Sequence, residues 1–236
     1  MREQPEQQAP PVQRLRIRYA KRGRLRFTSH RDFSRAFERA IFRARLPMAY
    51  SSGFNSHPRI SYAGASPTGA ASEAEYVEIG LAQVVDPAFI RAQLEEALPD
   101  GLDVLEVVES AGGSLADLMQ GSHWLIDLIA EPDACASAVA TFLATETVLV
   151  ERMTKKGLRE FDSRAAVISL SSAAHGDGAR LDMVLRHAVP AVRPDDVLAG
   201  LASVAGLATT GAPLLTRLAQ GPLDEATGEI GDPLHV

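Results

Sequence analysis

The sequence has one cysteine and no long apolar segment, and each shortage excludes a class of protein. Cys135 is the single thiol among 236 residues, which rules out an internal disulfide framework and an iron–sulfur cluster held by several thiolates of this chain. No apolar run approaches the roughly 18–20 residues that a membrane-spanning helix needs. The N-terminal segment lacks the apolar core of a secretory signal. We therefore expect a cytoplasmic protein.

The sequence also lacks recognisable catalytic motifs. Its six histidines show no paired metal-ligand spacing, the cysteine has no CxxC partner, and no GxSxG, HExxH, Walker A or GxGxxG occurs. We predict no metal site and no self-contained catalytic centre, and we therefore expect that the chain is not an enzyme. The weak candidates are His30 and His57, which would form an acid/base pair if the fold brings them together.

What the sequence does have is a strong charge asymmetry. The formal net charge is −6, from 24 basic and 30 acidic side chains. Residues 1–64 contain 14 of the basic and only 4 of the acidic side chains, and the remainder of the chain is strongly acidic. An asymmetry of this size suggests a polyanionic partner for the basic part.

Periodicity predicts a strand, helix, strand, strand, helix, strand order in the first part of the chain. Alternation over 14–19 indicates a strand with an apolar face (Leu15, Ile17, Tyr19) and a basic face. A helix follows, with Ser29 as N-cap and an apolar stripe, and ends near Leu46-Pro47. The other expected elements are strands over 59–62, 74–81 and 104–108 and a helix over 87–98.

The same order is expected to recur in the second part. It comprises strands over 123–129, 180–187 and 214–218, helices over 133–144 and 194–204, and strands or one long bent hairpin over 148–153 and 165–170. The predicted fold class is therefore α+β, with two tandem ferredoxin-like (split βαβ) units and antiparallel sheets. The expected boundaries are a flexible leader (1–12), a basic first unit (13–112), an acidic second unit with one basic hairpin (113–221) and a flexible tail (222–236).

The basic side chains of the first unit form the main candidate site. Arginines on the outer face of the first strand, in the following segment and along one face of the helix could neutralise phosphates and release counterions. The alternative is that they pair with acidic residues on neighbouring strands, such as Glu75 and Glu78. The candidates for nucleic-acid or anion binding here are Arg16, Arg18, Arg24, Arg26 and Arg31.

Two loops add further candidates. In the segment 50–59, small residues allow close backbone approach, and the side chains of Asn55, His57 and Arg59 can contact an anion or a base. Phe54 could stack on a base there or could be anchored in the core. The segment 153–164 is the main basic cluster of the acidic half, and its sequence predicts a hairpin tip. Its candidates for nucleic-acid or anion binding are Lys155, Lys156, Arg159 and Arg164.

Three separated motifs carry a resemblance. The run FTSHRDFSRAFERAI, the run LPMAYSSGFNSHPRISYAGASPTGAASEAEYVEI and the later KKGLREFDSR occur in that order. Together they resemble the radical SAM-linked protein family over residues 14–219, with Ser56 at a position where that family usually has proline. The resemblance implies a partnership with a radical SAM enzyme. That partner would hold S-adenosylmethionine and an iron–sulfur cluster, because this chain lacks the CxxxCxxC cluster motif.

These observations lead to one hypothesis and two alternatives. The first is an accessory, substrate-binding module that presents a structured RNA (tRNA or rRNA) to the radical SAM enzyme. The second is a protein-interaction subunit that docks on that enzyme without RNA. The third is a metal-independent endoribonuclease using the two candidate histidines.

Overall fold

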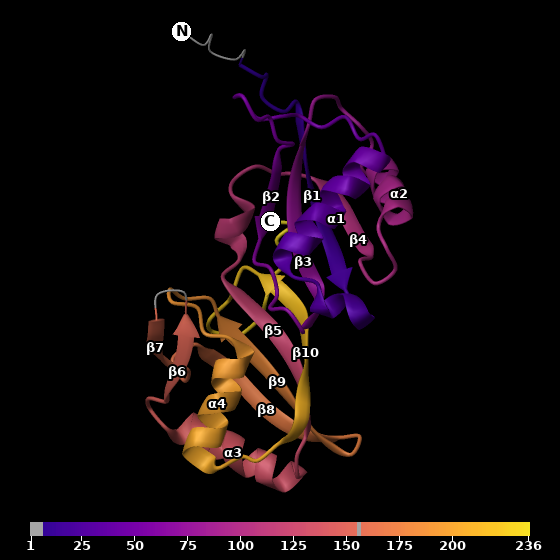
Figure 1. Cartoon of the computed structure of the whole chain (residues 1–236). Helices are drawn as coiled ribbons and strands as arrows, with labels where there is room; N and C mark the ends of the chain where they lie inside the picture. The colour runs from indigo at the N-terminus through magenta and orange to yellow at the C-terminus, as the bar shows by residue number, and fades with distance from the viewer. Residues whose placement is uncertain (1–6, 155–156) are drawn as a thin grey trace. The chain divides into compact units, whose positions relative to one another are not determined.

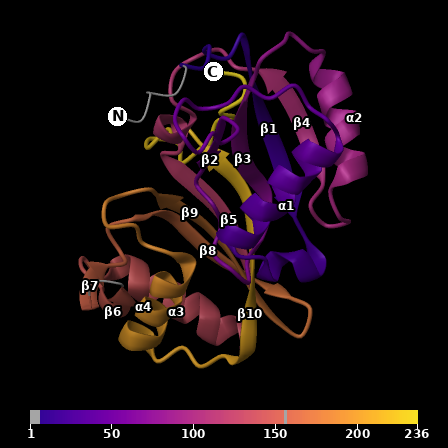
Figure 2. The same ribbon diagram turned by 45° about the horizontal axis from the view of Figure 1, so that its top comes forward.

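The computed structural model describes residues 7–154 and 157–236, which belong to two compact units. The first unit comprises Met1–Asp117 together with Leu234–Val236, and the second comprises Leu118–Pro233. Each unit contains an antiparallel sheet and two α-helices (Figures 1 and 2). Two short 3-10 helices, η1 (Gly23–Phe27) and η2 (Leu115–Leu118), lie in the connections.

The first unit has the ferredoxin-like strand order. Its elements are β1 (Gln13–Lys21), α1 (His30–Arg43), β2 (Ile60–Ala63), β3 (Ala71–Leu81), α2 (Pro87–Ala97) and β4 (Val104–Glu109). Strand β1 pairs antiparallel with both β3 and β4, and β2 pairs antiparallel with β3. The resulting order β4-β1-β3-β2 is that of a split βαβ sheet and confirms the predicted fold class.

The second unit repeats this order with one insertion. Its elements are β5 (Gly121–Ile129), α3 (Pro132–Ala144), β6 (Leu149–Thr154), β7 (Gly157–Asp162), β8 (Val167–His175), β9 (Gly178–Arg186), α4 (Pro194–Ala205) and β10 (Thr210–Gly221). Strand β5 lies between β10 and β9, and β8 flanks β9. Strands β6 and β7 form a separate hairpin, inserted between α3 and β8.

Both helices of the first unit pack against the apolar face of its sheet (Figure 1). The alternation in β1 places Leu15, Ile17 and Tyr19 in the core as expected, and all three are buried. Tyr19 stacks on Phe33 of α1, with ring centroids 4.3 Å apart. Burial of each large side chain contributes about 1.5–3 kcal/mol, and this apolar contact fixes which face of α1 is exposed to solvent.

The two ends of α1 are defined by different capping devices. Ser29 Oγ accepts a hydrogen bond from the Asp32 N–H, as the sequence predicted. At the other end Arg45 has a φ of +51°, and its N–H donates to Phe42 O while the Leu46 N–H donates to Ile41 O. This is a Schellman motif, in which the left-handed position is usually glycine. The helix therefore ends slightly earlier than the Leu46-Pro47 boundary expected.

A hydrogen-bonded chain and a tight helix contact organise the second unit. Trp124 Nε1 donates to Ser122 Oγ, which lies 2.9 Å from His187 Nε2, and His187 Nδ1 lies 2.9 Å from Met119 O. Burial lowers the pKa of His187, so the neutral imidazole is favoured. A second feature of this unit is Gly200, which lets α4 approach α3 closely because glycine has no side chain.

The C-terminal segment from residue 222 is not the loose tail expected. Leu223 forms a β-bridge with Ile230, Asp224 Oδ1 accepts from the Ala226 N–H, and Leu234 is buried. The paired backbone and the buried apolar side chain explain why this segment is ordered. Of the expected leader, residues 1–6 lie outside the described residues, while the Val12 N–H donates to Leu81 O of β3.

Among the described residues, no helix is both long and apolar enough to cross a membrane.

Candidate nucleic-acid interface

Arg16, a predicted phosphate contact, is instead a buried structural residue. Its side chain is 1% exposed, and its Nε donates to Glu78 Oε2 at 3.2 Å. Its Nη2 donates to the carbonyl oxygen of Gly112 at 2.5 Å. Arg14 donates to the other oxygen of Glu78 at 3.1 Å. The pairing alternative is therefore correct for Glu78, and Arg16 is not available to a phosphate.

The next arginines of the first unit also make contacts within the protein. Arg18 is half-buried, and its Nε donates to Glu73 O at 2.8 Å. Arg22 pairs with the carboxylates of Glu73 and Asp103, and these hydrogen bonds raise its pKa. Glu75, the other expected partner, accepts a hydrogen bond from the Ser66 N–H at 3.2 Å. The outer face of β1 is thus a paired surface more than a free basic one.

The segment after β1 is more open. Arg24 is exposed, whereas Arg26 is half-buried with its guanidinium carbon 4.7 Å from the centroid of the Phe27 ring. Phe27 is itself 60% exposed. An arginine beside an exposed aromatic ring is a combination that nucleic-acid surfaces use.

The outer face of α1 carries the least neutralised arginines. Arg31, Arg35 and Arg39 are exposed, and none of them makes an ion pair within the part of the chain that the structure describes. Successive residues turn by about 100°, so these three and Phe42 occupy one sector of roughly 80° opposite the core. Phe42 is 83% exposed. The fourth arginine of the row, Arg43, donates to backbone carbonyls at the end of α2.

A groove lies between the last turns of α1 and the segment 46–58. It has a volume of about 590 Å³. We call it the Phe42 groove; its lining residues are Glu38, Ile41, Phe42, Arg45, Leu46, Tyr50 and Pro58. Sequence reasoning did not identify this groove, although the absence of Phe42 from the apolar stripe of α1 was a signal that this side chain is exposed.

The candidate loop side chains lie on the surface near this groove. Asn55 and His57 are exposed, and Arg59 Nε donates to Tyr50 O at 3.2 Å. His57 and Arg59 line a hollow of about 250 Å³. Phe54 is 71% exposed, so its expected alternative role as a core anchor is wrong.

The two candidate histidines occupy different places. The His30 ring packs edge-on against Tyr62, with centroids 5.0 Å apart. The His57 N–H donates to Ser51 Oγ at 3.1 Å. Four residues of mostly extended chain lie between His57 and Tyr62, a span of about 15 Å. This geometry gives no support to an acid/base pair.

The hairpin candidates belong to the second unit. Lys155 and Lys156 lie outside the described residues, and Arg159 is exposed. Arg164 is half-buried and donates to Val167 O at 3.1 Å, so it supports the chain locally. The hairpin is held by Arg152, which pairs with Asp196 of α4 and lies over the Phe161 ring at 4.3 Å.

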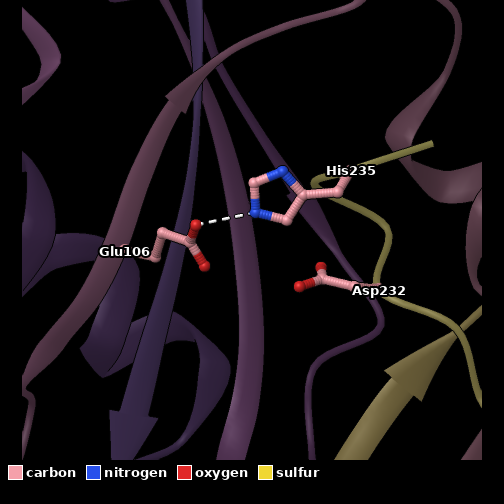
Figure 3. A group of neighbouring side chains, drawn as sticks. All are labelled: Glu106, Asp232 and His235. Carbon is pink, nitrogen blue, oxygen red and sulfur yellow. Dashed lines mark hydrogen bonds and ion pairs between the residues drawn. The ribbon is translucent and has the colours of Figure 1, made fainter.

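One histidine of the first unit has an acidic partner. His235 Nε2 lies 2.8 Å from Glu106 Oε1 (Figure 3). These two residues offer two possible metal ligands within the unit, whereas a structural zinc site takes four. The predicted absence of a metal site stays a prediction.

Comparisons with known proteins place the chain in a family. No curated protein matches the sequence. One similar solved structure is titled "Crystal Structure of a Cbf5-Nop10-Gar1 Complex", at 11% sequence identity and a TM-score of 0.46. The match covers 91% of this chain and 54% of that one, so the chain spans about half its length. The model of the family described as "Uncharacterized protein conserved in bacteria (DUF2344)" matches residues 14–194, most of the chain, and the chain therefore belongs to that family.

Proposed function

We propose that this chain is an accessory module that binds a structured RNA, such as tRNA or rRNA, and presents it to a partner radical SAM enzyme. The observation that carries the RNA part is the row of Arg31, Arg35 and Arg39 on the outer face of α1. These side chains are exposed and without ion pairs in the described structure, so they can exchange counterions for phosphates. The interface is centred on α1, and the outer face of β1 contributes less than its sequence suggested.

The partnership rests on the resemblance of three motifs to the radical SAM-linked family. S-adenosylmethionine and the iron–sulfur cluster would be bound by the partner enzyme. Cys135 cannot replace such a cluster motif, since it is one buried thiol whose pKa is raised by burial. Affinity purification of the tagged chain from its native cells tests the partnership. If neither a radical SAM enzyme nor RNA is recovered, the proposal is contradicted.

The RNA part is tested by fluorescence anisotropy with labelled tRNA over a salt series. Each phosphate contact contributes about 0.7–0.9 to the slope of log K against log salt. We expect Arg35→Gln to reduce the magnitude of that slope by this amount. The matched control is Arg91→Gln, which removes an exposed helical arginine from α2. Equal binding by both variants and the unmodified protein would show that α1 does not contact phosphates.

A protein-docking role is the second candidate. The β6–β7 hairpin exposes two directly paired apolar side chains, Met153 (72% exposed) and Leu158 (57% exposed). Exposed apolar pairs of this kind are typical of interaction surfaces. Under this alternative, Met153→Ser with Leu158→Ser disrupts the complex with the radical SAM enzyme, and the unmodified protein binds no tRNA.

A further inference from the structure

The outer face of α1 has two neighbouring hollows with different linings. The larger is the Phe42 groove, which is mainly apolar and includes the half-exposed ring of Tyr50. The smaller has a volume of about 350 Å³ and is lined by Arg35, Glu38, Arg39 and Phe42. Glu38 and Phe42 line both hollows, so an apolar aromatic groove continues directly into a guanidinium-lined hollow.

Arg45 lines the groove from a backbone conformation that favours glycine. Its φ of +51° places it at the left-handed position of the Schellman motif that ends α1. A residue with a Cβ is strained there, and glycine would form the same motif without this strain. Arg45 makes no ion pair within the described residues, so no contact of this kind compensates for the strain. A strained position that retains a long cationic side chain suggests a functional use of that side chain.

The chemistry of the two hollows matches a nucleotide. An exposed aromatic ring stacks on nucleobases of any sequence. The arginines suit a phosphate, whereas the Glu38 carboxylate would repel one and would instead accept hydrogen bonds from the amino or imino groups of a base. The larger volume is within the range of small-ligand pockets, about 300–1,000 Å³.

We propose that these hollows bind one unpaired nucleotide of an RNA. The base packs against Phe42 and Tyr50 with its polar edge toward Glu38, and the adjoining phosphate lies beside Arg35 and Arg39. Arg45 contributes a further positive charge at the rim of the groove. This inference deepens the proposed function and rests on it, since it specifies that the RNA offers an unstacked base as well as a helical backbone.

The test compares two labelled probes, a mixed-sequence 12-nucleotide single-stranded RNA and a fully paired duplex of the same sequence. We expect Phe42→Ala to weaken binding of the single strand about 5- to 150-fold, the range for loss of one stacked base. The salt slope stays unchanged, because no charge is lost, and duplex binding changes little. The matched control is Phe89→Ala, which removes another exposed ring from α2.

Arg45→Gly provides the second arm. We expect it to weaken single-strand binding and to reduce the salt slope by about 0.7. Its melting temperature should not fall, because glycine relieves the left-handed strain. A melting temperature lowered by this substitution would show that Arg45 is structural and would overturn its assigned role.

The failure of this inference differs from that of the proposed function. If RNA binding depends on Arg35 but not on Phe42 or Arg45, the nucleotide site is wrong while the RNA-binding function stands. If neither probe binds at low salt, both are wrong. If Phe42→Ala abolishes co-purification of the radical SAM enzyme and leaves RNA affinity unchanged, the groove is a protein-docking site and the proposal is overturned.

Discussion

Replacement of Glu78 by glutamine removes one negative charge from the interior of the first unit and leaves the side-chain shape nearly unchanged. The Glu78 carboxylate accepts hydrogen bonds from Arg14 Nη1 at 3.1 Å, Arg16 Nε at 3.2 Å and Ser110 Oγ at 2.9 Å. Because Arg16 is 1% exposed, its charge cannot turn toward water when the carboxylate is lost. Removal of one partner of a buried ion pair costs about 3–5 kcal/mol. At about 4 °C per kcal/mol, that is a fall of roughly 12–20 °C in the melting temperature of this unit.

A matched control for Glu78→Gln is available on β3, the strand that holds Glu78. Glu73 pairs with Arg22, and both side chains are partly exposed. Exposed pairs contribute about 0–1 kcal/mol, so Glu73→Gln should change the stability little. Arg16→Met should cost less than Glu78→Gln, because Glu78 then keeps its contacts with Arg14 and Ser110.

Urea denaturation measures these differences if two signals are followed. The single tryptophan, Trp124, belongs to β5, so its fluorescence reports the second unit, while far-UV circular dichroism reports both. We expect Glu78→Gln to shift the circular dichroism transition and to leave tRNA affinity of the folded protein unchanged. If Glu78→Gln and Glu73→Gln are equally stable and Arg16→Met loses RNA affinity, the structural assignment of Arg16 is wrong.

Two further predictions concern the second unit. The pKa of His187 is lowered in the folded protein, so the stabilisation from the neutral imidazole is fully present above the unfolded pKa of about 6.5 and is lost as the pH falls through the lower folded pKa. Urea titrations followed by Trp124 fluorescence between pH 7 and 5 should show this loss. If the slope of unfolding free energy against pH is the same in His187→Gln, the prediction is contradicted. Gly200→Ala should destabilise this unit by about 1–3 kcal/mol, because the new Cβ would lie 2.7 Å from Ser163 Oγ and 2.8 Å from the Phe142 ring; wild-type stability in the same assay would show that α4 can move away at no cost.

The order of elements was predictable because it depends on local signals. Alternation in β1 and the cap at Ser29 are encoded within a few residues, and both are present as expected. Strand β7 was not separately predicted, because most of its side chains on both faces are exposed and its sequence shows no alternation. The ordered C-terminal segment was missed for a related reason. Its turns use Gly, Pro and Asp, which are also the residues of loose segments.

The site was predicted less well, because the availability of a charge depends on distant residues. The alternation in the sequence correctly predicted which side chains lie on each face of β1. It did not predict the partner of Arg16, because the carbonyl oxygen that accepts its hydrogen bond belongs to Gly112, 96 residues away. The arginine row of α1 was visible from its spacing of four residues. The Phe42 groove requires Tyr50 and Pro58 to lie beside the end of α1, and no periodic signal encodes that placement.

The strand order of the two sheets also determines how each unit can fold. In the first sheet the central pair joins β1 to β3, with Leu15 opposite Ile79, about 60 residues apart. Loop-closure entropy must be overcome before such a pair gains any stabilisation. Strand β1 has no strand partner until β3 has been synthesised, because it pairs with β3 and β4. We therefore expect each unit to acquire its structure late and cooperatively, at the millisecond rates of mixed α/β domains, without a persistent N-terminal intermediate.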